Sequence, residues 1–180
     1  MNMKTCAKTL IFAMLLLPGL VMADFLEKTG TFESRLMLSD TVRLNVDTGS
    51  GSIEVRSGPA GEASIKGVVR VRKGGFWGKG GDADELLQQV KDNPPIELSG
   101  NRLKVGHFSD RSLRKRVSVS FEIVVPADTE VVADSGSGSI TVVNIDASVS
   151  ADTGSGSVTL ENITGSANAD TGSGSVTLEN

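Results

Sequence analysis

Asp152-Thr-Gly-Ser-Gly-Ser-Val-Thr-Leu160 is the stretch of sequence that decides the fold, because it recurs along the chain at a constant step. Close copies begin at Asp134 and at Asp170, so that each copy starts 18 residues after the previous one. A further copy stands apart upstream, at Asp47–Val55. A constant step of this kind is typical of repeat proteins, in which each unit is too small to bury its own apolar face and stacks on its neighbour.

Each repeat contains two short runs in which apolar and polar residues alternate. In the repeat that begins at Asp152, the apolar positions are Val158, Leu160, Ile163, Ala167 and Ala169. Alternation with a period of two predicts β-strands, and the Gly and Asn residues between the runs favour turns. We therefore predict an all-β fold, in which the repeats form a parallel β-helix, a solenoid-like stack with 18-residue rungs.

A stack with this step places equivalent side chains in columns. Val158 is then expected between Ile140 and Val176, and Ala151 beside Ala169. An antiparallel sandwich built of hairpins is the alternative, since it also has glycine-rich turns and alternating strands. We favour the stack, because hairpins give no reason for identical residues to recur at identical steps.

A segment without repeats, residues 58–116, forms an insert between the first copy and the tandem repeats at 131–180. We predict a short helix in it that begins after Asp82 and has an apolar face made of Ala83, Leu86, Leu87 and Val90. This helix is expected to cover one open end or edge of the stack. After the insert, the regular alternation of Val117–Val125 predicts an amphipathic strand.

The insert also contains a hairpin signal. Gly100-Asn101 lies between two short alternating runs, and this dipeptide favours a tight turn. The resulting register sets Leu98 opposite Leu103 and Glu97 opposite Lys104, so the apolar face and the charge pairing agree.

The first residues of the chain have the order of features of a signal peptide, which we assign to residues 1–23. Lys4 and Lys8 give a positive start, an apolar stretch follows, and small residues lead up to Ala23. We expect cleavage near Ala23 and a periplasmic or secreted protein. Residues 24–180 then form a single mature domain without a transmembrane anchor.

Composition argues against several classes of function. The chain has 18 Lys and Arg against 22 Asp and Glu, and loss of the two leader lysines leaves a net charge of 16 − 22 = −6. Such a balance gives no electrostatic reason to bind nucleic acid. The only Cys, Cys6, precedes the apolar stretch of the leader, and the only His, His107, is expected at the surface or at a hairpin end. We therefore expect a protein that is not an enzyme and has no cofactor.

The segment Phe121–Ile140, together with the Gly-Ser-Gly copies before and after it, resembles the bacterial β-strand-repeat family labelled "putative adhesin", whose function is unknown. The resemblance covers residues 41–180. It implies a right-handed β-helix-like fold in an exported or envelope-associated protein, and it implies no catalytic residues.

The Asp-Thr-Gly-Ser motif at Asp47 is also the pattern around the catalytic Asp of aspartic proteases. That chemistry needs two carboxylates about 3 Å apart that share a proton. In a stack, equivalent Asp residues lie about 4.8 Å apart along one open edge, so we do not expect proteolysis.

The ladder Asp134, Asp152 and Asp170 suggests a calcium site, because a divalent cation between rungs would offset the repulsion of the carboxylates. We favour a turn role instead, in which each Asp accepts the backbone N–H two residues further on. A second aligned row, Asn144, Asn162 and Asn180, is expected to form amide hydrogen bonds along its column rather than to recognise a ligand.

Two basic runs are the remaining candidates for binding. One consists of Arg111, Arg114, Lys115 and Arg116, and the other of Arg70, Arg72, Lys73 and Lys79. Aromatic residues flank the second run, so its loop, with Lys73, Phe76, Trp77 and Lys79, offers a site for an anionic glycan or lipid headgroup. The alternative is a solvated loop whose Trp packs on the body of the protein, and we favour it.

These observations predict an exported, non-enzymatic binding protein. Its flat sheet face, rich in Ser, Thr and Asn, is expected to dock a protein or glycan partner of unknown identity in the cell envelope. The alternative is a structural or stress-related envelope component that self-associates end to end, because the stack stops at Asn180 directly after a strand and an uncapped end can pair with another chain.

Overall fold

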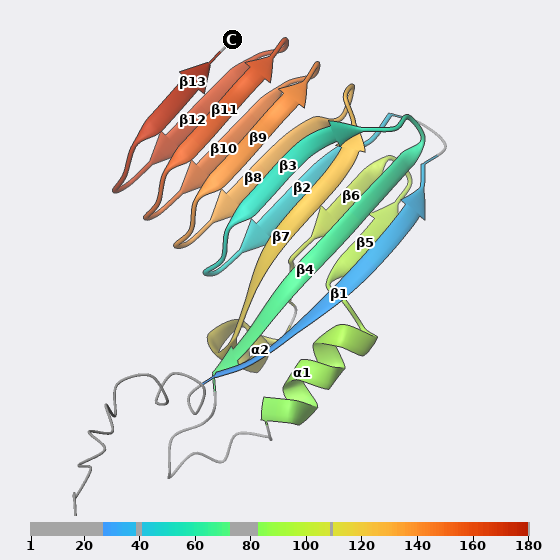
Figure 1. Cartoon of the computed structure of the whole chain (residues 1–180), viewed down its shortest axis with the longest axis vertical. Coiled ribbons are helices and arrows are strands. Elements are labelled where there is room, and N and C mark those ends of the chain that lie inside the picture. The colour runs from blue at the N-terminus through green and yellow to red at the C-terminus, as the bar shows by residue number, and fades with distance from the viewer. Residues whose placement is uncertain (1–26, 39–40, 73–82, 109, 180) are drawn as a thin grey trace, which may run out of the picture.

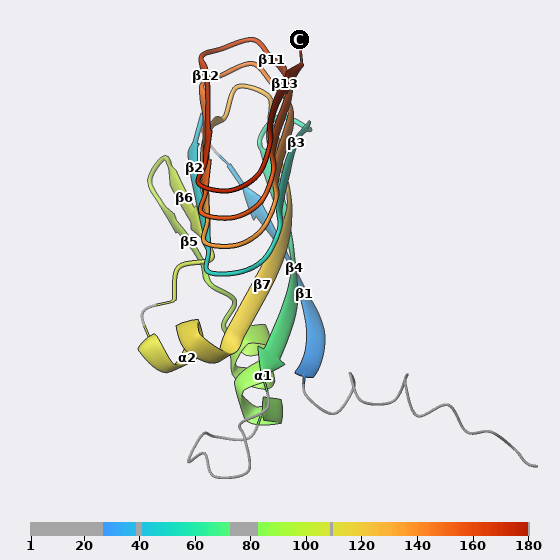
Figure 2. The same cartoon turned by 90° about the vertical axis from the view of Figure 1, so that its left-hand side faces the viewer.

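The computed structural model describes residues 27–38, 41–72, 83–108 and 110–179, which form two β-sheets that face each other (Figure 1, Figure 2). The elements in chain order are β1 (Glu27–Met37), β2 (Arg43–Thr48), β3 (Ile53–Gly58), β4 (Glu62–Arg72), α1 (Ala83–Asp92), β5 (Ile96–Ser99), β6 (Arg102–Val105), α2 (Arg111–Arg116), β7 (Val117–Pro126), β8 (Glu130–Ser135), β9 (Ile140–Ile145), β10 (Val149–Thr153), β11 (Val158–Ile163), β12 (Ala167–Thr171) and β13 (Val176–Glu179).

Both sheets are mixed. The front sheet has seven strands in the order β1-β4-β7-β3-β9-β11-β13, and the back sheet has six in the order β12-β10-β8-β2-β6-β5. Strands pair in parallel from β7 to β13 in the front sheet and from β12 to β6 in the back sheet. The pairs β1·β4, β4·β7 and β5·β6 are antiparallel.

The predicted right-handed parallel β-helix is therefore wrong as a description of the fold, which is all-β with short helices and two mixed sheets. The reason lies in the turn after β3. β3 ends at Gly58 and the chain reverses near Gly61, whose φ is 75°, so β4 stays in the front sheet instead of passing to the back sheet. β4 therefore runs antiparallel to both of its neighbours, β1 and β7.

The columns predicted for the tandem repeats are confirmed. From β8 to β13 the chain alternates between the back and front sheets. Val158 pairs with both Ile140 and Val176, and Ala151 pairs with Ala169. The isolated first copy extends the same columns, because Ile53 pairs with Ile140.

The core lies between the two sheets and is built from the inward residues of the alternating strands. Ile53, Ile140 and Val158 from the front sheet are at most 1% exposed. Ala133 and Ala151 face them from the back sheet and are equally buried. Small side chains on one sheet opposite branched side chains on the other leave little void, which favours close packing of the sheets.

The helix and the hairpin predicted in the insert are confirmed. In α1, Ala83 and Val90 are buried, and Leu87 lies against Gly30 of the edge strand β1. The helix packs against β1, the edge strand of the front sheet, and against its neighbour β4 (Figure 1). The hairpin β5–β6 has the predicted register, with Glu97 opposite Lys104, and its turn residue Gly100 has a φ of 58°.

Strand β1 was not predicted from the sequence, although it contributes a core side chain. Phe32 of β1, Gly67 of β4 and Phe121 of β7 lie in register across three neighbouring strands. Gly67 has no side chain, so the Phe32 ring lies over it and meets the Phe121 ring edge to face, with centroids 6.4 Å apart. This aromatic contact adds to the pairing of β1 with β4, which runs the whole length of the strand.

Three of the predictions concern residues that the structure does not describe. The signal peptide at residues 1–23, the loop with Lys73, Phe76, Trp77 and Lys79, and Asn180 all lie outside the described ranges. Within those ranges, neither α1 nor α2 is long and apolar enough to cross a membrane.

Candidate functional site

The Asp-Thr/Ser-Gly-Ser-Gly motif forms the corner at which each repeat passes from the back sheet to the front sheet. Its second residue points inward, and Ser135 and Thr153 are only 6% and 1% exposed. Thr153 Oγ1 donates a hydrogen bond to Gly138 O, and Thr171 Oγ1 donates one to Gly156 O, both over 2.9 Å. Each hydroxyl therefore ties its corner to the corner of the preceding repeat.

The glycines of the motif lie where successive corners approach each other most closely. A Cβ atom on Gly154 would lie 2.7 Å from Gly136 O. Carbon and oxygen atoms that are not bonded repel strongly at this distance, so glycine is the residue that fits. Gly49 holds the same motif position in the first copy. A Cβ atom added to Gly49 would have no atom of the described residues within 4 Å.

The Asp of the motif points outward from the back sheet. Asp47, Asp134, Asp152 and Asp170 pair in register and form one exposed column, so the structure adds Asp47 to the predicted ladder. Burial raises the pKa of Asp134, and the neighbouring carboxylates of Asp47 and Asp152 raise it further. The column is therefore a place of charge repulsion within the fold.

This Asp column differs in detail from the sites that its sequence suggested. Asp170 Oδ1 accepts a hydrogen bond of 2.9 Å from the N–H of Thr171, which is the next residue rather than the second one on. The carboxylates stand along a sheet face, whereas a protease dyad places two of them together in a cleft. In the part of the chain that the structure describes, no three His, Cys, Asp or Glu residues are grouped so as to hold a metal ion. Calcium binding by Asp134, Asp152 and Asp170 stays the alternative that we do not favour.

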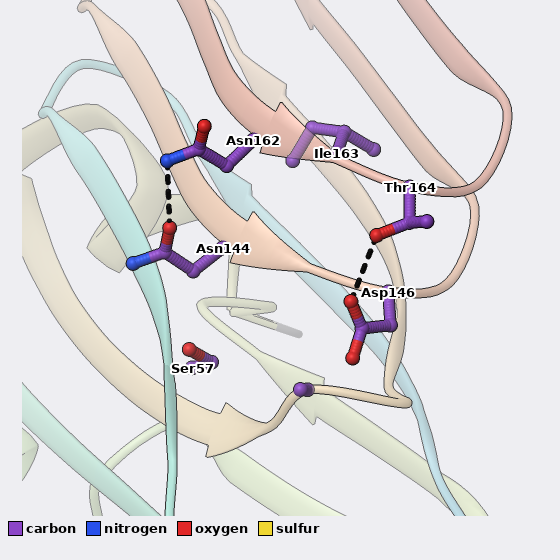
Figure 3. A pocket seen from close by; sticks show the side chains of 7 residues that line it. Ser57, Asn144, Asp146, Asn162, Ile163 and Thr164 are labelled. Atoms are coloured by element: carbon purple, nitrogen blue, oxygen red, sulfur yellow. Dashed lines mark hydrogen bonds between the residues drawn. The ribbon is translucent and has the colours of Figure 1, made fainter. Parts of the chain in front are cut away.

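A groove of about 590 Å³ lies at the other corner of the repeats, after β9 and β11 (Figure 3). Asn162 Nδ2 donates to Asn144 Oδ1 over 2.9 Å, and Thr164 Oγ1 donates to Asp146 Oδ1 over 2.8 Å. The φ angles of Asn144 and Asn162 are 59° and 52°, in the left-handed region that Asn tolerates better than most residues. The predicted amide row is confirmed for this pair, and stacking alone accounts for the polar lining of the groove.

A pocket of about 310 Å³, which we call the basic pocket, brings the two basic runs of the sequence together. Arg70 and Arg72 near the end of β4 point outward, because they alternate with the buried Val69 and Val71. The other cations come from the end of α2, which leads directly into β7. The pocket is lined by Arg70, Arg72, Arg114, Lys115, Arg116, Glu27, Ser50, Val117 and Ser118.

Antiparallel pairing of β4 with β7 is what joins the two runs. Arg70 lies opposite Ser118, so the residues just before β7 meet the end of β4. Arg116 Nη2 donates a hydrogen bond to Arg72 O over 3.1 Å and fastens α2 to this strand end. The sequence contained a signal for this site, since Arg70 and Arg72 share one strand face. Only the pairing of β4 with β7 shows that the basic run of α2 lies beside them.

Within the described part of the chain, four of the five cations of the basic pocket have no ion-pair partner. Arg70, Arg72, Arg114 and Lys115 are exposed, and none forms an ion pair with another residue in the described ranges. Glu27, opposite Arg72 in the β1·β4 register, is the one acidic residue among the lining residues. The pocket is thus a concentrated positive site on a chain whose net charge is −4.

His107 is exposed after β6, which confirms the predicted surface position. It lines a pocket of about 210 Å³ with Asp47, Asp134, Lys104 and Asn45. Asn45 Oδ1 is buried and has no hydrogen-bond partner in the described part of the chain. Lys104 offsets part of the carboxylate charge here, so this end of the Asp column is mixed in charge.

Comparison with known proteins finds distant likenesses among solved structures. One, described as "a putative cell adhesion protein" from Clostridium sporogenes, is 11% identical with a TM-score of 0.49, and the match covers 83% of this chain and 99% of that one. Another, described as "a putative adhesin" from Bacteroides fragilis, is 10% identical with a TM-score of 0.26, and the match covers 83% and 97%. No protein-family profile and no curated protein matches the chain. Likenesses this distant assign neither a ligand nor an activity.

Proposed function

We propose that the chain is an exported, non-enzymatic binding module with an adhesin-like role, which docks a protein or glycan partner in the cell envelope. The docking surface is the outer face of the front sheet. The observation that supports this choice best is the column of Thr141, Thr159 and Thr177, which lie in register on neighbouring parallel strands with their side chains partly exposed.

A column of threonines is suited to binding for a physical reason. Each side chain is short and stiff at χ1, so it loses little conformational entropy when a partner covers it. Each hydroxyl can both donate and accept a hydrogen bond. Neighbouring strands repeat these groups about every 4.8 Å, and Ser157 and Ser175 add a second polar pair whose Oγ atoms are 3.0 Å apart. Such a surface fits an extended partner with repeated polar groups.

The non-enzymatic part of the proposal is supported by the use that the fold makes of the repeated motif. The hydroxyls of Ser135, Thr153 and Thr171 donate to backbone carbonyls of neighbouring corners, and the glycines allow the corners to approach. Residues that resemble a protease signature thus have a structural role in packing one repeat on the next.

The docking surface can be tested with one substitution on each sheet. We expect Thr159→Arg to reduce capture of a partner from envelope extracts or on a glycan array, because the long side chain would block the threonine column. Ser150→Arg, at a partly exposed outward position of the back sheet, is the matched control and should leave capture unchanged. Equal capture by Thr159→Arg and the unaltered chain would contradict the proposed face.

Export is proposed from the signal-like order of residues 1–23. Expression of the full chain followed by intact-mass measurement of the periplasmic and medium fractions tests it. A mature chain that begins at Asp24 is expected, and an uncleaved chain confined to the cytoplasm would contradict export.

Self-association is the second candidate function, and one observation favours it. Val176 and Leu178 on β13 are 42% and 58% exposed, whereas Val158 and Leu160 in the preceding repeat are at most 1% exposed. Apolar side chains and an edge strand together can pair with a second chain. Light scattering over a range of concentrations tests this. The unaltered chain should grow in size with concentration and Leu178→Lys should not, while a strict monomer would contradict it.

A further inference from the structure

We propose that the basic pocket binds a sulfate or phosphate ester group carried by a saccharide. The inference rests on the proposed binding function and adds to it the chemical class of the group that is recognised. The pocket has fixed walls, a concentrated positive charge, donors that suit an oxyanion, and room for a sugar ring.

The walls of the basic pocket are held in place by the fold. One wall is β4, which pairs with β7 over eight residues from Ser64 to Val71. The other wall is α2, which Arg116 fastens to the carbonyl oxygen of Arg72. Both walls therefore hold the backbone positions of the cations close together.

The charge of the pocket calls for an anion. Five cationic side chains and one carboxylate, that of Glu27, line it. Like charges held close together raise the free energy of the empty site, and an anion that binds there removes this cost. The affinity gained in this way is electrostatic, so it falls as the salt concentration rises.

The donors of the pocket match a tetrahedral oxyanion. Guanidinium groups are planar forks that donate paired hydrogen bonds to sulfate or phosphate oxygens. Ser50 and Ser118 add hydroxyl donors to the lining. A sulfate or phosphate ester offers three terminal oxygens to these donors, whereas a carboxylate offers two, so the ester can engage more of the cations at once.

The size and position of the pocket favour a saccharide over a membrane surface. Its volume of about 310 Å³ is roughly that of ten liquid waters, which leaves room for a sugar ring beside the ester group. Arg70 and Ser118 point outward on the same face of the front sheet as the threonine column. Glu33, Glu54 and Glu122 also lie on this face. Arg56 and Lys66 pair with Glu54 and Glu122, but Glu33 has no ion-pair partner in the described ranges, and a flat anionic bilayer would have to approach it.

The test uses the full chain, calorimetric titration and heparin hexasaccharide as the sulfated probe. We expect saturable binding that weakens about tenfold or more in Arg70→Ala/Arg114→Ala, since each lost charge-assisted contact contributes to affinity. Arg35→Ala/Arg102→Ala removes the same charge from exposed positions outside the pocket and should bind like the unaltered chain. Thermal melting of both variants verifies that the fold is intact.

Competition identifies the group that the pocket reads. Sodium sulfate and sodium phosphate are added at matched ionic strength, with sodium chloride as the reference, and the salt that displaces the probe more strongly names the preferred ester. No saturable binding of the probe, or an equal loss in the two double variants, would overturn the proposal. So would binding of anionic phosphatidylglycerol vesicles through Arg70 and Arg114 without binding of the hexasaccharide.

These outcomes are separable from failure of the proposed docking face. If Thr159→Arg abolishes capture of a partner and the hexasaccharide does not bind, the docking face stands and the ester site falls. If the hexasaccharide binds through Arg70 and Arg114 while Thr159→Arg captures partners normally, the ester site stands and the threonine face falls.

Discussion

Thr153 Oγ1 donates a hydrogen bond over 2.9 Å to the carbonyl oxygen of Gly138, which belongs to the preceding repeat. The threonine side chain is only 1% exposed, while the accepting Gly138 is partly exposed. Equivalent bonds run from Ser135 to Gly51 and from Thr171 to Gly156. The second residue of the motif therefore needs a hydroxyl group because it links one repeat to the next.

Removal of one such hydroxyl should destabilise the stack. Thr153→Val keeps the shape of the side chain but leaves the Gly138 carbonyl without its buried donor, which we expect to cost about 1–3 kcal/mol of unfolding free energy. Thr153→Ser keeps the hydroxyl and should cost less. Thr159→Val, on the outer face, is the control for the same chemical change and should be nearly neutral. Urea denaturation measures all three, and equal stability of the Thr153→Val and Thr159→Val variants would contradict the role of the bond.

The glycine columns can be tested with the same substitution in two repeats. Gly154→Ala places a Cβ atom 2.7 Å from Gly136 O, so the corners must move apart, and we expect a loss of about 1–3 kcal/mol. Gly49→Ala is the matched control, because the described residues leave 4 Å of free space around the new atom. Thermal melting measures the difference. A Gly49→Ala variant that loses as much stability as Gly154→Ala would show that close approach is not the reason for glycine.

The Asp column should make stability depend on pH in a defined direction. The pKa of Asp134 is raised in the folded chain, so its contribution favours the native state below the ordinary value of 3.8 and is lost as the pH rises through the raised pKa. Asp134→Asn should therefore stabilise the protein near neutral pH and have no effect near pH 3. Two carboxylates about 5 Å apart in water repel by roughly 0.8 kcal/mol, so a gain on the order of 1 kcal/mol is expected at low salt.

A control for this measurement lies at the end of the column. Asp170 has one Asp neighbour in the described register, where Asp134 has two, so Asp170→Asn should stabilise the protein by a smaller amount. Thermal melting between pH 3 and pH 8 gives both curves. A gain for Asp134→Asn that persists unchanged at pH 3 would rule out charge repulsion as its cause.

The antiparallel part of the front sheet can be tested at β1. Phe32→Ala removes a ring that is 7% exposed and meets Phe121 across Gly67, so we expect a loss of about 3–5 kcal/mol. Thr31→Ala changes the neighbouring outward residue and should cost little. Hydrogen exchange of the amides in β4 reports whether β1 covers this edge. Retention of full stability in Phe32→Ala would contradict the placement of β1.

The repeated part of the fold could be predicted because local sequence determines it. A constant step of 18 residues aligns Val158 with Ile140 and Val176 whatever the rest of the chain does. The hairpin that pairs Glu97 with Lys104 follows in the same way from its turn residues and its alternation.

The sheet order of the non-repeating strands could not be predicted, because it depends on contacts between distant segments. β1 has a weak pattern, since its inward positions include Gly30 and Ser34, and Phe32 is its one buried residue. Gly67 is the one sequence signal for this contact, because a glycine inside a strand often marks the close approach of a neighbour. That neighbour, Phe32, lies 35 positions away in the sequence.

The basic pocket was hidden for a similar reason. Its two runs were recognised, but a charged run in the sequence does not show what lies beside it. α2 has only six residues, too few for a helical period to be read, and its run of cations resembles a solvated loop. The pairing of Arg70 with Ser118 is what turns two ordinary basic runs into one site.

The alignment of successive repeats is the claim on which the threonine column and the corner bonds both depend. Ser157 and Ser175 are equivalent residues of neighbouring repeats, and their Oγ atoms are 3.0 Å apart. Ser157→Cys/Ser175→Cys, in a Cys6→Ser background, should therefore form a disulfide readily under mild oxidation, since the two Cα atoms lie within disulfide range in a parallel pair. Ser157→Cys/Thr177→Cys shifts the register by two residues and should stay reduced. A first pair that stays reduced, or that oxidises no faster than the second, would contradict the alignment.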